Sequence, residues 1–242
     1  MKNLKIFVLH SDKNYLNKIK DNSFIEKVNL NYLSLSKAHQ KNELAENRFF
    51  IHLYNNLSII DNYEFICIAS ARWNEKYKVH SEKQILPIEE IHVGYEKFKN
   101  NTIYVAAPIY DWYRESCEQH EGMNFYIDEL LRRNNFKKLG MSFYSNNFLC
   151  KKNILIDFLK WWKKEFDYFF NKYGINYDYD SSNFSEYKEH VNCAYFYERL
   201  TLAYFANKKY EIIKLEPRFF KLNNNYGRNE LLKRFEKKNK FF

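Results

Sequence analysis

The 242-residue sequence is poor in the residues that mark flexible or cross-linked chains. It contains only 5 glycines and 3 prolines, which argues against long disordered linkers. Its four cysteines are Cys67, Cys117, Cys150 and Cys193. They are widely spaced and form no CxxC pair, so the sequence signals neither a zinc site nor a disulfide framework.

Several catalytic motifs are also missing. No glycine-rich phosphate loop is present, which argues against a kinase or a nicotinamide-dependent enzyme. GxSxG and HExxH are absent as well. The apolar run near the N-terminus is too short for a signal peptide, and no apolar stretch approaches the length of a membrane span. We therefore expect a cytoplasmic protein.

The residues that are abundant are hydrophobic, aromatic and basic. Hydrophobic residues make up 45% of the chain, enough to bury a sizeable core. The net charge of +9 attracts phosphate groups in general, whether in nucleic acid, nucleotide diphosphates or an anionic membrane face. A solvated lysine-rich surface explains this charge equally well. Charge alone therefore does not select a partner.

Hydrophobic patterning in the first half indicates buried strands alternating with helices. Continuous apolar runs predict strands at Ile6–Leu9, Glu64–Ala69 and Thr102–Ala107, the last stopped by Pro108. A weaker alternation suggests another strand over Val28–Leu35, and helical spacing suggests a helix over Lys37–Leu57. This alternation predicts an α/β fold with a mostly parallel sheet flanked by helices.

The second half is more helical. We expect helices over Glu121–Arg133, 153–172 and His190–Asn207, the second ended by Gly174, and then a strand over Tyr210–Leu215. We expect one domain over 1–217, with a nucleotide-binding half at about 1–112 and an acceptor half at about 113–217. Residues 218–242 form a basic tail that can touch an anionic membrane or remain a solvated end.

Glu198 is the residue that the helical pattern singles out. Its neighbours on the same helix face are apolar, so the carboxylate is expected to be partly buried. Such a group can act as a general base or accept hydrogen bonds from substrate hydroxyls. The competing interpretation is a structural ion pair with an arginine such as Arg72 or Arg48.

Polar residues at the predicted strand ends are the next candidates, because ligands of open α/β sheets bind outside the carboxyl ends of the strands. His10, Ser11 and Asp12 follow the first strand, and the His and Asp side chains can hold a base or ribose. Arg72 follows a later strand, and its guanidinium can grip a diphosphate. The competing interpretation of each is a polar turn residue.

Two further polar residues are assigned to the acceptor side. His120 is placed at the start of a helix, and Asn146 lies in a segment that reads as a strand. Asn146 can face an acceptor sugar or satisfy a backbone group. A lone histidine such as His120 is more often structural than catalytic.

Asp178-Tyr179-Asp180 is the one Asp-x-Asp sequence considered as a metal site. Two carboxylates at this spacing can chelate a divalent ion bound to a diphosphate. The pair lies in a polar loop far from any predicted strand end, so we assign it no metal.

A series of segments resembles a family of bacterial capsular and exopolysaccharide biosynthesis proteins, formerly a domain of unknown function and regarded as glycosyltransferase-like. The matching segments, in order, are the Lys5–Leu9 run, Glu46-Asn47-Arg48-Phe49-Phe50, Ser70-Ala71-Arg72-Trp73, Ile103–Pro108, Glu118-Gln119-His120, Ser145–Lys152, the 153–172 helix, Tyr195-Phe196-Tyr197-Glu198-Arg199-Leu200 and Ile212–Pro217. Where the family has a His-Tyr-Arg-Arg-like motif, this chain keeps only Arg72. The order of the segments is a stronger signal than any one of them.

The resemblance implies a GT-A-like fold and a glycosyltransferase that uses a nucleotide-sugar donor and a glycan or lipid-linked acceptor. Taken with the residue patterns above, we expect a catalytic Glu198, a nucleotide diphosphate bound by His10, Ser11 and Arg72, and an acceptor near His120 and Asn146. Such folds usually carry an Asp-x-Asp metal motif after the strand that ends here near Ala69. One alternative is that the divalent metal, Mn²⁺ or Mg²⁺, is dispensable and that cations such as Arg72 replace it. The other is that another carboxylate such as Asp111 binds the metal.

Two other function classes remain open. The charge and the aromatic residues would suit a non-enzymatic nucleic-acid binder, but the basic residues are dispersed and no RNA-binding aromatic motif is present, so no nucleic-acid partner is expected. The other alternative is a capsule-modifying enzyme that transfers a group other than a sugar.

Overall fold

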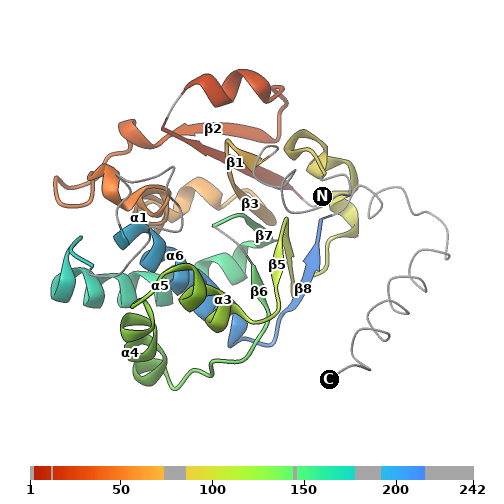
Figure 1. The fold of residues 1–242 in the computed structure, drawn as a ribbon. Helices are drawn as coiled ribbons and strands as arrows, with labels where there is room; N and C mark the ends of the chain where they lie inside the picture. Colours follow the sequence, from red (N-terminus) through yellow and green to blue (C-terminus); the bar gives the residue numbers. More distant parts are fainter. Residues whose placement is uncertain (1–2, 12, 74–85, 144–145, 178–191, 216–242) are drawn as a thin grey trace, which may run out of the picture.

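The computed structural model describes residues 3–11, 13–73, 86–143, 146–177 and 192–215. A six-stranded sheet runs through the molecule in the order β2-β1-β3-β7-β4-β8 (Figure 1). Its strands are β1 (Leu4–His10), β2 (Ile25–Asn29), β3 (Phe65–Ser70), β4 (Thr102–Val105), β7 (Phe148–Lys151) and β8 (Glu211–Lys214). All its neighbouring pairs are parallel except those of β7, which is antiparallel to both β3 and β4. The prediction of a mostly parallel α/β sheet is confirmed.

Helices and short 3-10 segments connect these strands. The α-helices are α1 (Asn47–Asn55), α3 (Trp112–Gln119), α4 (Asn124–Asn134), α5 (Lys152–Tyr173) and α6 (Asn192–Ala206). The 3-10 segments are η1 (Lys13–Lys18), η2 (Leu30–Tyr32), η3 (Asn42–Leu44), η4 (Leu57–Ile60) and η5 (Ile88–Lys97). A small second sheet pairs β5 (Pro108–Ile109) with β6 (Ser142–Phe143). No helix in the described part is both long and apolar enough to cross a membrane.

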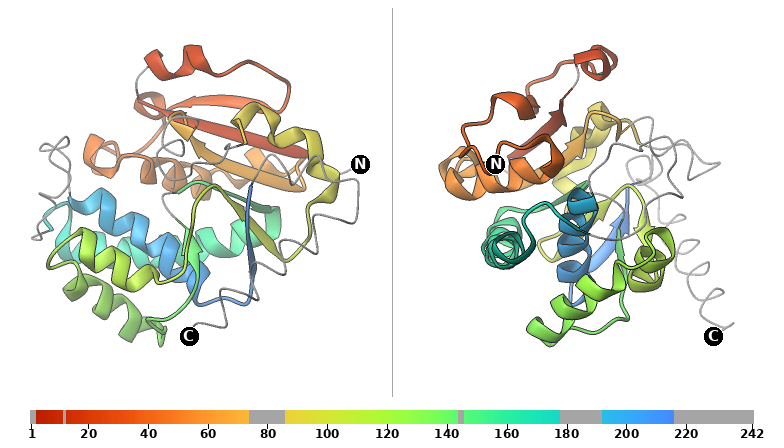
Figure 2. Two further views of the ribbon diagram at one scale, coloured as in Figure 1. Left: turned by 45° about the vertical axis from the view of Figure 1, so that its right-hand side comes forward. Right: turned by 60° about the vertical axis from the view of Figure 1, so that its left-hand side comes forward.

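The central sheet is buried on both faces, which explains its continuous apolar strands. Alternate residues of β1 point to opposite sides: Phe7 and Leu9 join one core, and Ile6 and Val8 join the other. The first core lies under α1, α5 and α6, with α3 and α4 packed on α6 (Figures 1 and 2). The second core is covered by η5 and the residues around it.

Helix α5 shows how the aromatic content is used. Phe158, Trp162 and Phe166 recur at helical spacing, and all three are fully buried against α1 and α6. Gly174 ends the helix with φ +64°, and its N–H bonds to the Phe170 carbonyl at 2.8 Å. The predicted helix and its glycine stop are confirmed, and the aromatic residues described here serve largely as core.

Two predictions in the first half need correction. The second strand spans Ile25–Asn29 rather than Val28–Leu35, because the Asn29 side chain accepts from the Asn31 N–H and starts η2. The helix predicted over Lys37–Leu57 forms only at Asn47–Asn55. Ala45 has φ +45°, which interrupts any helix before that point.

Two predictions in the second half also need correction. His120 ends α3 instead of opening a helix, and the following helix starts at Asn124 rather than Glu121. Helix α3 was not predicted, although Asp111 is a recognisable cap whose side chain accepts from the Arg114 N–H. The segment around Asn146 is not yet strand, since β7 begins at Phe148.

Candidate functional site

The carboxyl ends of β1 and β3 lie side by side. Leu9 pairs with Ser70, and the Ala71 N–H bonds to the Leu9 carbonyl at 2.8 Å. The parallel register therefore brings His10 and Arg72 to one edge of the sheet. The strand ends that carry the predicted nucleotide-binding residues are thus adjacent in the fold.

The three residues predicted to hold the nucleotide differ in exposure along this edge. His10 is buried, Arg72 is partly exposed and Ser11 is exposed. The Ser11 carbonyl accepts from the Asn31 side chain at 3.3 Å, and the Arg72 N–H bonds to Ser70 Oγ at 3.3 Å. These hydrogen bonds fix the backbone of the turns that follow β1 and β3.

Arg48 fixes the loop next to this edge. Its side chain is buried, and it donates to neutral oxygens: the carbonyls of Ala45 and Gln40 and the amide side chains of Asn31 and Asn42. Burial lowers the pKa of Arg48, with Glu43 acting in the opposite direction. Since Asn31 also bonds to the Ser11 carbonyl, Arg48 holds the loop and the strand end together.

The start of β7 enters the same edge from the opposite direction. The Asn147 side chain is fully buried, and its Oδ1 accepts from the Ser70 N–H. Asn146 Oδ1 accepts from Thr201 Oγ1 at 2.7 Å, and its Nδ2 donates to Asn47 Oδ1 at 3.2 Å. Asn146 thus joins α1 and α6 to the sheet edge, and its predicted contact with an acceptor sugar stays a prediction.

Glu198 lies on α6 one turn before Thr201. Its side chain is 20% exposed, which agrees with the expectation of partial burial. Glu198 Oε1 lies 3.0 Å from Arg199 Nη1, so the pairing arginine is its own neighbour. The Arg199 side chain is 3% exposed, and its Nη2 donates to Gln119 Oε1 at 3.2 Å. The ion pair orients the carboxylate and ties α6 to the end of α3.

His120 belongs to the same cluster. Its ring centroid lies 4.6 Å from that of Tyr195 at an interplanar angle of 31°, and the residue is 1% exposed. Burial lowers the pKa of His120 to about 3, and the positive charge of Arg199 adds to the effect. The imidazole is therefore neutral at physiological pH, so it can donate one hydrogen bond and accept another.

Metal ligands do not converge in the described part of the chain. No group of three or more His, Cys, Asp or Glu side chains lies close enough together there to hold an ion. Asp111, the alternative metal carboxylate, caps α3 and lies 3.4 Å from Arg114 Nε. Asp178 and Asp180 lie outside the described residues. The donor set of the described residues does not fit a divalent ion.

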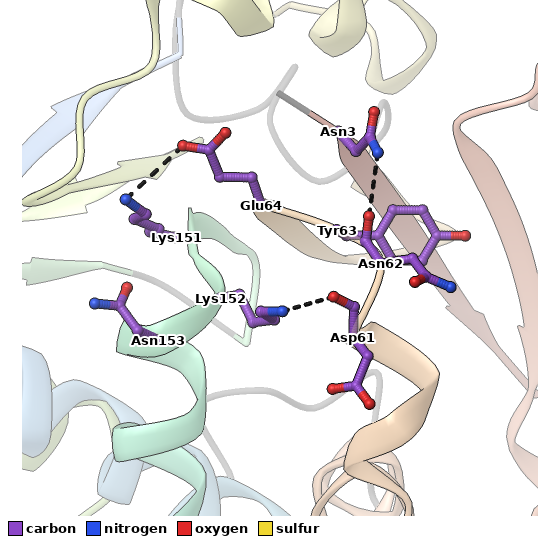
Figure 3. A pocket seen from close by; sticks show the side chains of 8 residues that line it. All are labelled: Asn3, Asp61, Asn62, Tyr63, Glu64, Lys151, Lys152 and Asn153. Carbon is purple, nitrogen blue, oxygen red and sulfur yellow. Dashed lines mark hydrogen bonds and ion pairs between the residues drawn. The ribbon is translucent and has the colours of Figure 1, made fainter. Parts of the chain in front are cut away.

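A surface hollow of about 310 Å³ lies at the opposite edge of the sheet (Figure 3). Lys152 Nζ donates to the Asp61 carbonyl at 2.6 Å, and Lys151 Nζ lies 3.8 Å from Glu64 Oε1. Both lysines are therefore engaged within the hollow. It contains none of the predicted site residues.

Arg199, Asn147 and Thr201 were not predicted as site residues. The signal for Arg199 is its position directly after Glu198. Asn147 gains its importance from the antiparallel register of β7 against β3, which continues the pairing of Ile68 with Phe148 toward Ser70. Such a register cannot be read from one sequence.

No protein-family model and no curated protein matches this chain. A solved apo structure of WbbM, a bifunctional glycosyltransferase, is similar in fold with a TM-score of 0.51. The two chains are 13% identical, and the match covers 89% of this chain and 45% of that one. The chain thus spans less than half of that neighbour. At this identity the likeness establishes a glycosyltransferase-like fold.

Proposed function

We propose that the protein is a glycosyltransferase that moves a sugar from a nucleotide diphosphate donor to a glycan or lipid-linked acceptor in bacterial surface-glycan synthesis. The observation that carries the proposal is a series of contacts at the sheet edge. The β1–β3 pairing brings His10 and Arg72 together, Ser70 bonds to Asn147, and the neighbouring Asn146 bonds to Thr201 of α6. This arrangement occurs in a fold shared with a glycosyltransferase.

The donor side uses the carboxyl ends of β1 and β3. Arg72 is partly exposed there, and its guanidinium can bind two diphosphate oxygens at once. As the bond from the anomeric carbon to the diphosphate oxygen breaks, negative charge grows on the leaving group, and a cation at that position stabilises it. His10 and Ser11 supply polar contacts to the ribose or base.

The acceptor side uses α6 and the end of α3. In an inverting reaction, Glu198 takes the proton of the acceptor hydroxyl while that oxygen bonds to the anomeric carbon and the nucleotide diphosphate leaves. In a retaining reaction, the same carboxylate accepts the hydroxyl hydrogen bond and positions the acceptor. The Arg199 ion pair holds the carboxylate in place for either course.

A thermal-shift screen of nucleoside diphosphates and nucleotide sugars tests the proposal. A ligand that binds only the folded state at 100 times its Kd stabilises it by about 2.7 kcal/mol. We therefore expect at least one nucleotide sugar to raise the Tm by several degrees, with or without Mn²⁺. Arg72→Gln should reduce this shift, whereas Arg132→Gln, a control on a distant exposed arginine, should keep it.

Failure of every nucleotide and nucleotide sugar to raise the Tm of the wild-type protein would contradict the proposal. A salt-dependent gel shift with random RNA, without any nucleotide-sugar effect, would instead favour the nucleic-acid-binding alternative.

A further inference from the structure

Two basic segments lie side by side at the end of the molecule where α4 and α6 terminate, at the bottom of Figure 1. The Lys137 N–H donates to Asn207 Oδ1 at 2.6 Å, and Asn207 Nδ2 donates to the Lys137 carbonyl at 3.1 Å. Gly140 lies so close to α6 that a Cβ there would be 2.5 Å from the Ala206 carbonyl oxygen. The loop after α4 and the turn after α6 therefore form one surface.

This surface, which we call the basic platform, is defined by exposed cationic residues of the two segments. They are Arg132, Lys137, Lys138, Lys208 and Lys209.

Neither 132–139 nor 206–210 contains an acidic residue. Lys138 pairs with Asp128 at 3.0 Å, and Lys208 lies over the Tyr204 ring. No carboxylate partner is seen within the described ranges for Lys137 or Lys209. Glu211, directly after the second segment, lies 3.6 Å from Lys99 Nζ. Cationic side chains outnumber carboxylates here, so the platform carries a local excess of positive charge.

An exposed leucine projects from the same surface. Leu139 directly follows Lys138, and 78% of its surface is open to solvent. A polyanion in water, such as RNA, gains little from an aliphatic side chain. An anionic lipid interface binds both the aliphatic side chain and the lysines, because the leucine inserts at the headgroup boundary while the flanking lysines contact anionic headgroups.

We infer that the basic platform docks the protein on an anionic lipid bilayer, with Leu139 as the inserting residue. The bilayer is favoured over nucleic acid by the pairing of unneutralised lysines with an exposed aliphatic side chain. The inference concerns a surface distinct from the sheet edge, so it can succeed or fail independently of nucleotide-sugar binding.

Vesicle co-sedimentation of the full chain tests this inference. Wild-type protein should bind phosphatidylglycerol-containing vesicles, bind phosphatidylcholine vesicles far less, and release as salt is raised. Since each lysine near an anionic surface contributes roughly fivefold in partitioning, K137Q/K209Q should weaken binding by about 25-fold. The control pair K20Q/K37Q removes the same charge from exposed positions before and after β2, the outermost strand on the side away from β8. This variant should bind vesicles like wild type.

Leu139→Ser supplies a second measurement that leaves the charge unchanged. It should weaken binding to anionic vesicles severalfold while leaving the Tm unaltered, because the side chain is exposed. The inference would be overturned if K137Q/K209Q bound vesicles as strongly as the wild-type protein. It would also be overturned if the two double variants lost vesicle binding to the same extent. A wild-type protein that does not bind vesicles but binds random RNA through Lys137 and Lys209 would also overturn it.

Discussion

At the scale of single residues, Glu198 and Arg199 adjoin in the chain yet occupy different environments. The carboxylate side chain is 20% exposed, and the arginine side chain is 3% exposed. Neighbouring positions on a helix do not face each other, so an ion pair between them requires a side chain to bend back along the helix surface. Arg199 also donates to Gln119 Oε1, and this second contact holds the guanidinium that pairs with the carboxylate.

Replacement of Glu198 by Gln tests its chemical role. The amide keeps the size of the side chain but cannot take a proton, so we expect transfer activity to fall about a hundredfold or more if Glu198 is the base. Stabilisation by a nucleotide sugar should persist, because the donor is held elsewhere. Activity is measured as sugar transfer and binding as the Tm shift.

Glu118→Gln provides the matched control for this variant. Glu118 is 66% exposed on α3 and lies 3.8 Å from Arg114. It should retain full activity. A Glu198→Gln protein that folds, binds donor and transfers sugar at the wild-type rate would remove Glu198 from the chemistry.

Helical periodicity predicted the partial burial of Glu198, because it determines which residues share a face. It did not identify the partner of Glu198, since it favoured neither Arg72 nor Arg48. Arg48 in fact bonds to the backbone and amide oxygens of its own loop. Pairing between side chains depends on distances in three dimensions, which periodicity does not contain.

At the scale of elements, the contact between α4 and α5 depends on a buried carboxylate. Glu129 accepts from Tyr168 at 2.6 Å, Lys172 at 2.7 Å and Tyr173 at 2.7 Å. Burial raises the pKa of Glu129, but these hydrogen bonds outweigh it and lower the pKa to about 2. The two helices are therefore joined most strongly when this carboxylate is ionised.

This contact predicts an acid-sensitive term in stability. The folded pKa lies below the ordinary value of 4.5, so the stabilisation is fully present above about pH 4.5 and is lost as the pH falls toward 2. It amounts to about 3 kcal/mol. Unfolding measured by denaturant between pH 6 and 3 should show a smaller acid loss for Glu129→Gln than for wild type.

Glu121→Gln is the control for this effect, because Glu121 is exposed at the loop before α4. Its stability should follow the wild-type pH dependence. An unchanged acid loss in Glu129→Gln would show that Glu129 does not contribute this term.

The loop before β6 packs against the end of α6 at Gly140. Its φ of +152° is rarely adopted by other residues, and an added Cβ would lie 2.5 Å from the Ala206 carbonyl oxygen. Gly140→Ala should therefore destabilise the protein by about 2–3 kcal/mol, measured by denaturant unfolding. Gly174→Ala should cost less than Gly140→Ala, because Gly174 also has a positive φ of +64° but nothing lies within 4 Å of an added Cβ.

A smaller loss for Gly140→Ala than for Gly174→Ala would show that the loop relaxes away from α6.

Elements such as α5 were predictable because their apolar residues recur over many turns. Helix α3 was not, since its eight residues are few and mostly polar, and only the Asp111 cap marks its start.

At the scale of the whole molecule, the sequence predicted a mostly parallel α/β fold from its alternating strands and helices. It could not predict the strand order, because β7 is as apolar as its parallel neighbours and its direction leaves no mark in composition. The two halves expected to bind nucleotide and acceptor share this one sheet, with β7 of the second half between β3 and β4 of the first. Whether they divide the two ligands stays a prediction.

The position of β7 has a consequence for biosynthesis. When the ribosome has released β3, the strand that will cover its free edge has not been made, and it arrives only after Phe148. At about 5–20 residues per second, the nascent chain presents an uncovered hydrophobic strand for several seconds. That interval is when chaperones have most to protect, and a message truncated before the codon for Phe148 would yield a product prone to aggregate.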